Sequence, residues 1–286
     1  MSDVSVIGLG AMGAKLARVL MENGYRVMVW NRTPQKAEPL VEAGARLAPT
    51  AADAVATSPT TLVCVHTHAD TRAILQTAPA ALAGKTIIEL STGGAREAKA
   101  LARWIEAQGA DCLIGMIGTF PTEIGKPGTA IVTAGSQAAW AAHAAMLRSL
   151  AGKSSYIGSD VGALAALFAG LFLPRQGFMF GMIYGALICE KAGVPMQTYV
   201  EQLPITLKLV HAYYDVFASS VPSGDFSNPP VTMATLLACF DDVLDTFAHS
   251  GVPNELPELL HRLMKRGVDA GHAHEQVTAL LKVLRG

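Results

Sequence analysis

A spacing of glycines near residue 10 limits how the first part of the chain can fold. Residues 4–17 read VSVIGLGAMGAKLA, in which Gly8, Gly10 and Gly13 separate a strand-like apolar run from a run with helical spacing. Such a turn lets the backbone approach a pyrophosphate at the N-terminus of the following helix. With a second strand close behind, it predicts a dinucleotide-binding βαβ unit, the alternative being a glycine-rich turn without a ligand. The residues expected to contact the cofactor here are Gly8, Leu9, Gly10, Ala11 and Met12.

The end of the second predicted strand indicates which dinucleotide would bind. It reads VMVWNRTPQKA, with Asn31, Arg32, Thr33 and Lys36 where an NAD site usually has a carboxylate for the ribose 2′-hydroxyl. A carboxylate would repel a 2′-phosphate, whereas a guanidinium binds one through two parallel hydrogen bonds. The sequence therefore predicts NADP(H), and a basic, solvated turn is the alternative interpretation.

Alternation of strand-like and helix-like runs predicts the fold of the first half. Apolar strands are expected in VSVIGLG, RVMVWN, TTLVCVHT, KTIIELST, DCLIGM and GTAIVTAG, with helices between them that include 70–82 and 94–108. Continuous apolar strands that alternate with helices are typical of a parallel sheet covered on both faces. We therefore expect an α/β Rossmann domain with a doubly wound, mainly parallel sheet over residues 1–160.

The second half has helical spacing throughout. We expect a long interdomain helix over 161–192 and an all-α domain over 193–286. The helices of that domain are expected over 196–219, 229–250 and 253–284, and the loop VPSGDFSNPP covers 221–230. The interdomain helix is apolar on all sides, which is typical of a helix that is buried all round. A membrane span needs ~20 apolar residues, and Pro174 and Arg175 interrupt the run earlier, so we expect no membrane contact.

Composition excludes some partners and favours others. The chain is 51% hydrophobic and 16% charged, which calls for a large core or a buried subunit interface. Its net charge is −1 and no basic run occurs, so nucleic acid is not an expected partner. The four cysteines form no CxxC pair and no signal peptide is recognisable, which favours a reduced, cytoplasmic protein. His66 and His68 lack a third ligand, so no metal is expected.

Several motifs together resemble one enzyme superfamily. GLGAMG, NRTPQKA and ELSTGG, followed by MIGTFPTEIGKP and YIGSDVGALAALF, are similar to the β-hydroxyacid dehydrogenases, and in particular to their imine reductase and reductive aminase branch. The resemblance implies NADPH as cofactor and hydride transfer to the C=N bond of a cyclic imine, or of an iminium formed from a ketone plus an amine. It also implies a homodimer with interlocked C-terminal helices, in which each active site is shared by two subunits. Val65, His66, Ser91 and Thr92 are then expected beside the cofactor.

The chain departs from the family pattern at the catalytic positions. No lysine occurs between Lys153 and Lys191, where hydroxyacid dehydrogenases of the superfamily place theirs. Imine reductases usually carry Asp or Tyr about six residues after the glycine of DVG, and here that position is Phe168. Thr92 and Gln176 replace a family asparagine and tyrosine. The expected substrate pocket is therefore unusually apolar, and it is expected to contain Thr92, Phe120, Phe168, Phe172, Gln176 and Met179.

Substitute proton donors are needed unless the substrate is a preformed iminium. Tyr213 and Tyr214 lie on a helix that by resemblance reaches the partner's site, and Tyr184 and Glu123 are further candidates. For the tyrosines the alternative is an interface or core aromatic, and for Glu123 it is a solvated loop carboxylate. An apolar wall would also suit a conjugated α,β-unsaturated iminium.

Two other functions stay open. One is a carbonyl or β-hydroxyacid oxidoreductase, against which the absent helix lysine weighs. The other is a catalytically degenerate NADPH-binding protein, which the missing acid would explain.

Overall fold

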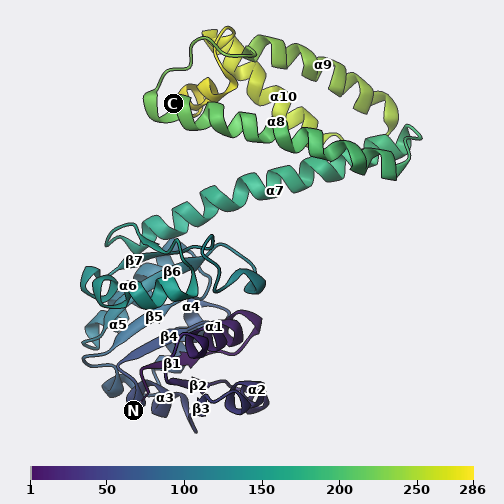
Figure 1. Cartoon of the computed structure of the whole chain (residues 1–286). Helices are drawn as coiled ribbons and strands as arrows, with labels where there is room; N and C mark the ends of the chain where they lie inside the picture. Colours follow the sequence, from purple (N-terminus) through teal and green to yellow (C-terminus); the bar gives the residue numbers. More distant parts are fainter. Residues whose placement is uncertain (1) are drawn as a thin grey trace. The chain divides into compact units, whose positions relative to one another are not determined.

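The computed structural model describes residues 2–286 and divides the chain into two compact units (Figure 1). The first unit ends at Leu173 and the second begins at Pro174, so the division falls inside helix α7 (Val161–Lys191). Each unit has its own apolar core. The domain boundaries expected after residues 160 and 192 stay predictions.

The first unit is built on a sheet that has eight strands within residues 2–286. The strands are β1 (Val4–Ile7), β2 (Val27–Trp30), β3 (Arg46–Leu47), β4 (Thr60–Val63), β5 (Thr86–Glu89), β6 (Asp111–Ile117), β7 (Ile131–Gly135) and β8 (Ser155–Tyr156). Their order is β3-β2-β1-β4-β5-β6-β7-β8, and each neighbouring pair is parallel except β6 with β7. The predicted doubly wound, mainly parallel sheet is confirmed. The strand order reverses between β1 and β4, and ligands of such sheets bind at the carboxyl ends of strands at this point.

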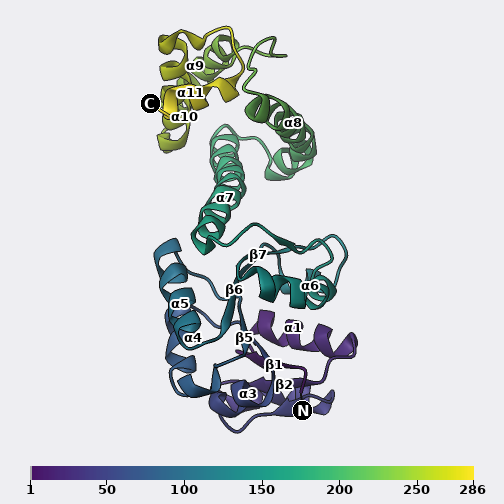
Figure 2. The same ribbon diagram turned by 90° about the vertical axis from the view of Figure 1, so that its left-hand side faces the viewer.

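Helices cover both faces of this sheet (Figure 2). One face carries α1 (Ala11–Glu22) and α6 (Gln137–Leu150), and the other carries α3 (Ala51–Thr57), α4 (His68–Leu75) and α5 (Ala95–Ala107). Because each face is packed against helices, all four residues of β1 and of β4 are buried. This double cover explains why the strands read as continuous apolar runs instead of alternating ones.

Several elements of the first unit are absent from the sequence prediction. They are α2 (Glu38–Glu42), α3, α6, the two-residue edge strands β3 and β8, and the 3₁₀ turns Pro34–Ala37, Pro79–Ala81 and Pro121–Glu123. Strands β3 and β8 are too short to show a period, and β3 is exposed. The sequences of α3 and α6 are rich in alanine, so their buried and exposed positions differ little in hydropathy. Such segments carry little periodic signal.

The second unit is helical, as predicted, but two of its boundaries differ. It contains α8 (Met196–Ser223), α9 (Met233–Ser250), α10 (Glu255–Gly267) and α11 (Leu280–Leu284), with a π turn at Val268–His272 and a 3₁₀ turn at Val277–Ala279. The prediction of one helix over 253–284 is wrong, because Gly271 adopts a φ of 91° and breaks it. The loop predicted at 221–230 begins later, since α8 continues to Ser223 and is capped by Gly224, where φ is 70°.

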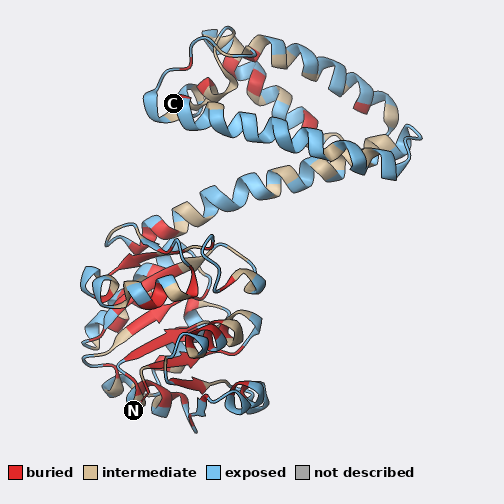
Figure 3. Cartoon of the chain, viewed as in Figure 1, coloured by how far each residue is buried: buried red, intermediate tan, exposed pale blue. Residues whose placement is uncertain are grey.

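Helix α7 is continuous through Pro174 and leaves most of its surface exposed in the single chain (Figure 3). Its 31 residues correspond to ~46 Å at 1.5 Å per residue. Of these, Val161, Gly162 and Leu164 are buried. By length and composition the helix could cross a membrane, although the core helix of a soluble protein passes the same test. The sequence predicted that this helix would be buried on all sides. In the single chain, most of α7 is instead exposed.

Candidate active site

The glycine turn after β1 is packed too closely for side chains at two of its three glycines. Gly8 has a φ of +92°, and a Cβ there would overlap the carbonyl oxygen of Cys64. A Cβ on Gly13 would overlap the carbonyl oxygen of Gly8. The first turn of helix α1 therefore packs directly against the glycine-rich loop. Gly10, in contrast, faces open space and caps α1 without any side-chain hydrogen bond. With no acid in its first turn, the N-terminus of α1 has free N–H groups and a positive end available to an anion.

The loop after β2 is tied to the glycine turn through Asn31. The side-chain oxygen of Asn31 accepts a hydrogen bond from the Leu9 N–H at 2.9 Å, and its amide nitrogen donates to the Thr33 carbonyl at 2.9 Å. Asn31 thus positions the two loops relative to each other. Arg32 and Lys36 remain exposed at the carboxyl end of β2. The uncapped helix and the exposed cations fit a dinucleotide that carries an additional phosphate.

A cavity of about 250 Å³ lies where β4 and β5 end, beside β6 and the first two turns of α7. Among the predicted site residues it is lined by Met12, Val65, Ser91, Thr92 and Phe168. Its other lining residues are Cys64, His68, Leu90, Gly93, Ala98, Ile114, Gly115, Met116, Ile117, Val161, Leu164 and Ala165. Most of these side chains are apolar, and the assignment of this cavity as the substrate pocket stays a prediction.

Of the remaining predicted pocket residues, the two in the first unit do not line this cavity. Phe172 stacks on Phe168 with 5.5 Å between ring centroids, but it does not line the cavity. Phe120 is 78% exposed, in the loop before the turn Pro121–Glu123. Gln176 and Met179 belong to the second unit, so their assignment to the pocket stays a prediction.

Of the four predicted proton donors, Glu123 lies in the first unit and does not line the cavity, and the three tyrosines belong to the second unit. Glu123 forms an ion pair with Lys126 at 2.7 Å and lines a separate hollow of about 650 Å³. The Tyr184 hydroxyl donates to Glu255 at 2.9 Å, and this hydrogen bond raises the pKa of Tyr184, which makes it a weaker acid. Tyr213 and Tyr214 are exposed on α8.

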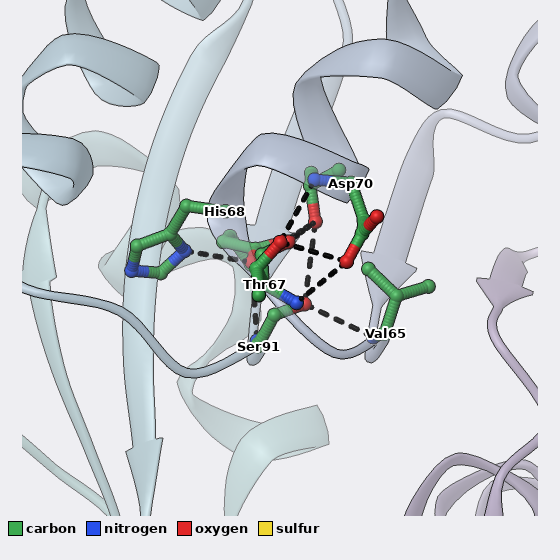
Figure 4. A network of polar contacts seen from close by, with 7 residues as sticks. Val65, Thr67, His68, Asp70 and Ser91 are labelled. Carbon is green, nitrogen blue, oxygen red and sulfur yellow. Dashed lines mark hydrogen bonds and ion pairs between the residues drawn. The ribbon is translucent and has the colours of Figure 1, made fainter.

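A buried carboxylate beside the cavity is the main feature that sequence reasoning missed. Glu89, the last residue of β5, is fully buried and accepts hydrogen bonds from His68, Thr71 and the Ser91 N–H (Figure 4). Ser91 in turn accepts from the Val65 N–H at 3.0 Å, which links the ends of β4 and β5. An acid within the otherwise apolar strand KTIIELST was the available signal. Among residues 2–286 no group of three or more His, Cys, Asp or Glu side chains could hold a metal.

The thiols near the cavity are not reactive. Burial, and then the charge of Glu89, raise the pKa of Cys64 to about 12. Burial likewise raises the pKa of Cys112, which lies on β6. A thiol rather than a thiolate is therefore present at neutral pH, and neither cysteine is a nucleophile.

The glycine turn, the exposed cations after β2 and the apolar cavity at the carboxyl ends of β4 and β5 together define a dinucleotide-binding α/β protein. Comparison with known proteins agrees. Residues 3–158 match the NAD binding domain of 6-phosphogluconate dehydrogenase, and residues 160–286 match the C-terminal domain of the NADPH-dependent reductive aminase-like proteins. The chain therefore belongs to the family of that NAD binding domain, in its imine reductase and reductive aminase branch.

Similar proteins match over nearly the full length of the chain. The NADPH-dependent reductive aminase of Aspergillus oryzae is 28% identical, covering 99% of this chain and 97% of the relative. The imine reductase of Myxococcus stipitatus, solved with NADP⁺, has a TM-score of 0.91 at 28% identity and 99% coverage of both chains. The reductive aminase of Aspergillus terreus, solved with NADPH4, cyclohexanone and allyl amine, has a TM-score of 0.88 at 29% identity and 100% coverage of both.

Alanine at Gly10 and at Gly13 should have different consequences. Gly10→Ala adds a methyl group in open space at an ordinary φ of −66°, so the fold should persist while dinucleotide affinity falls by at least about tenfold, because the backbone can no longer approach the pyrophosphate. Gly13→Ala should destabilise the fold, because its methyl group meets the Gly8 carbonyl.

Tryptophan fluorescence during urea unfolding measures the stability of the first unit, since Trp30, Trp104 and Trp140 all lie there. NADPH titration measures the affinity. Unchanged NADPH binding by Gly10→Ala would show that the N-terminus of α1 does not hold the pyrophosphate.

Proposed function

We propose that this chain is an NADPH-dependent reductase of C=N bonds, acting on cyclic imines and on iminium ions formed from a ketone and an amine. The observation that supports the proposal most directly is the composition of the cavity wall at the carboxyl ends of β4 and β5. Helix α7 contributes Val161, Leu164, Ala165 and Phe168 to that wall, and no lysine. The full-length similarity to a reductive aminase and an imine reductase supports the same reaction.

The side of the cavity wall that α7 forms has neither a proton donor nor a cation, and this favours a C=N over a C=O substrate. Reduction of a carbonyl develops negative charge on oxygen, which needs a donor or a cation close by. An iminium already carries a positive charge. Hydride addition neutralises that charge, so no anion forms. The hydroxyacid dehydrogenase reaction is disfavoured for the same reason, since α7 has no lysine before Lys191. A flat, conjugated iminium would also fit between apolar side chains such as Leu164 and Phe168.

The chain's residues would hold NADPH at three places. The turn from Gly8 to Met12 would hold the pyrophosphate at the N-terminus of α1, and Arg32, Thr33 and Lys36 would bind the 2′-phosphate. Val65, His66, Ser91 and Thr92 at the ends of β4 and β5 would border the nicotinamide and its ribose. The bound cofactor supplies a hydride from C4 of the nicotinamide. The residues around the cavity orient the acceptor carbon and exclude water from it.

A second copy of this chain is the proposed partner. In the single chain α7 exposes large apolar side chains on all sides, among them Leu173, Phe180 and Ile183, and α8 adds Ile205, Leu209 and Tyr214. Soluble monomers rarely expose apolar surface this extensive. A homodimer with interlocked C-terminal helices would bury it and bring Tyr213 and Tyr214 to a partner's cavity. All four cysteines are free, which suits a reduced, cytoplasmic setting.

Turnover on a cyclic imine tests the reaction. We expect loss of NADPH absorbance when the protein is mixed with 1-pyrroline, because hydride addition to its C=N carbon consumes the cofactor. Turnover with an aldehyde or a hydroxyacid alone would instead support the carbonyl or hydroxyacid reaction. Tight NADPH binding without turnover on any of these substrates would indicate a degenerate, non-catalytic protein.

Arg32→Ala should separate the two coenzymes. Loss of the guanidinium should weaken NADPH binding by about tenfold or more and leave NADH binding within about twofold, because NADH has no 2′-phosphate for the guanidinium to bind. Fluorescence titration with both coenzymes measures this change. Arg46→Ala, at the exposed edge strand β3, is the matched control. Equal losses for both coenzymes would contradict the assignment.

The dimer should depend on the apolar surface of α7. We expect a mass in solution of twice the chain's 30.0 kDa, and Phe180→Arg should shift it to the single-chain mass because a charge would be buried in the interface. Light scattering coupled to gel filtration measures the mass. Gln197→Arg adds the same side chain at an exposed polar position and should remain dimeric. A wild-type protein that elutes as a single chain would rule the dimer out.

A further inference from the structure

The proposed reaction leaves one buried ionisable pair beside the cavity without a role. His68, at the start of α4, is 3% exposed, and Glu89, at the end of β5, is fully buried. The pair lies in the first unit, and His68 itself lines the cavity. Burying two such groups is costly unless they are hydrogen-bonded to each other and to their surroundings. Their neighbours therefore show what the pair is built to do.

Glu89 is held by three donors. Its Oε1 accepts from His68 Nδ1 at 3.0 Å and from the Ser91 N–H at 3.1 Å, and its Oε2 accepts from the Thr71 hydroxyl at 2.9 Å. Each carboxylate oxygen thus has a partner, and the side chain has one fixed orientation. A carboxylate with these donors sets which nitrogen of the imidazole carries a proton. Nδ1 is the donor toward Glu89, as in the second-shell arrangements that orient functional histidines.

The histidine ring is also fixed on its other side. Gly93 packs against the ring, and a Cβ at Gly93 would overlap His68 Cδ2 and lie 2.9 Å from Nε2. Figure 4 shows the second ring nitrogen on the side of the His68 imidazole that faces away from Ser91. Within the described residues, the ring's hydrogen bond to Glu89 is made through Nδ1 alone, so Nε2 is left for a ligand in the cavity.

No other side chain of the cavity wall is suited to donate a proton at neutral pH. The position of the usual family acid is Phe168, and the Cys64 thiol is a very weak acid because burial raises its pKa to about 12. Ser91 is engaged as acceptor for Val65 and as partner of Thr71. Thr92 has a hydroxyl, which is also a very weak acid. His68 is thus the one wall residue, within 2–286, whose ordinary chemistry includes proton transfer near neutral pH.

We propose that His68, oriented by Glu89, is the proton donor to the substrate nitrogen in this chain. The proposal rests on the C=N reductase function proposed above. As hydride from the cofactor forms the new C–H bond at the imine carbon, the C=N π pair moves onto nitrogen. That nitrogen takes the proton from Nε2 of the imidazolium form of His68, in which both ring nitrogens carry protons. An N–H bond therefore forms on the substrate as the Nε2–H bond breaks. NADPH is oxidised to NADP⁺, the imine is reduced to the amine, and a neutral imidazole remains with its Nδ1 proton on the Glu89 side.

Two substrates distinguish a proton donor from a structural residue. A neutral cyclic imine needs a proton at nitrogen, whereas its N-methyl iminium salt has no site for one. His68→Asn places an amide nitrogen near the Nδ1 position and can keep the hydrogen bond to Glu89, but it carries no transferable proton at Nε2. A positioned general acid contributes roughly 10²–10⁴-fold, so we expect kcat on the imine to fall by about 100-fold and kcat on the iminium to stay within about twofold.

Further variants complete the comparison. Glu89→Gln, which removes the charge that orients the imidazole, should show the same selective loss to a smaller extent. His143→Asn replaces a half-buried histidine of α6 outside the cavity, and it should leave both rates unchanged. NADPH titration and urea unfolding of each variant provide readouts independent of turnover, and both should match the wild type for His68→Asn.

Each other outcome overturns the proposal. Equal losses on both substrates would make His68 structural, and wild-type rates on both would show that it donates nothing. A selective loss in Tyr184→Phe, Tyr213→Phe or Tyr214→Phe, with His68→Asn unaffected, would assign the donor to that tyrosine. If the wild-type chain turns over neither substrate, the C=N reductase function itself fails, and this proposal fails with it.

Discussion

The close approach of two backbone segments at the glycine turn is the constraint on which the rest of the site depends. Gly8 lies against the carbonyl of Cys64 at the end of β4, and Gly13 lies against the carbonyl of Gly8. This close packing leaves no space for a Cβ at either position. It also places the start of α1 where β1 and β4 end. The N-terminus of α1, the loop after β2 and the cavity at the end of β5 are thereby arranged around one crevice of the sheet.

The cavity combines an apolar wall with one buried polar network. The wall lowers the local polarity, which strengthens any interaction with a charged substrate such as an iminium. The network, centred on Glu89, links the ends of β4 and β5 through Ser91 and fixes the ring of His68. The proton transfer proposed for His68 would then take place on the sheet side of the cavity, and Phe168 on α7 would contribute shape alone.

The second unit raises a different physical problem, that of uncovered apolar surface. Its core consists of Phe226, Met233 and Ala279 with a few partly buried neighbours, while α7 and α8 expose many large apolar side chains. The exposed apolar side chains of α7 and α8 therefore contribute little hydrophobic stabilisation to the single chain. Association of two chains through these helices is the simplest arrangement that would realise it.

The sequence by itself determined the features that local physics controls. Glycine spacing, apolar strands and the run from 161 to 191 predicted the βαβ start, the parallel sheet and the long helix, because each depends on residues close together in the chain. Tertiary structure alone decided what depends on distant partners. The tie from Asn31 to Leu9 and the pairing of His68 with Glu89 join segments in ways that no local period reveals. A histidine and a glutamate 21 residues apart become one unit only because parallel strands end side by side.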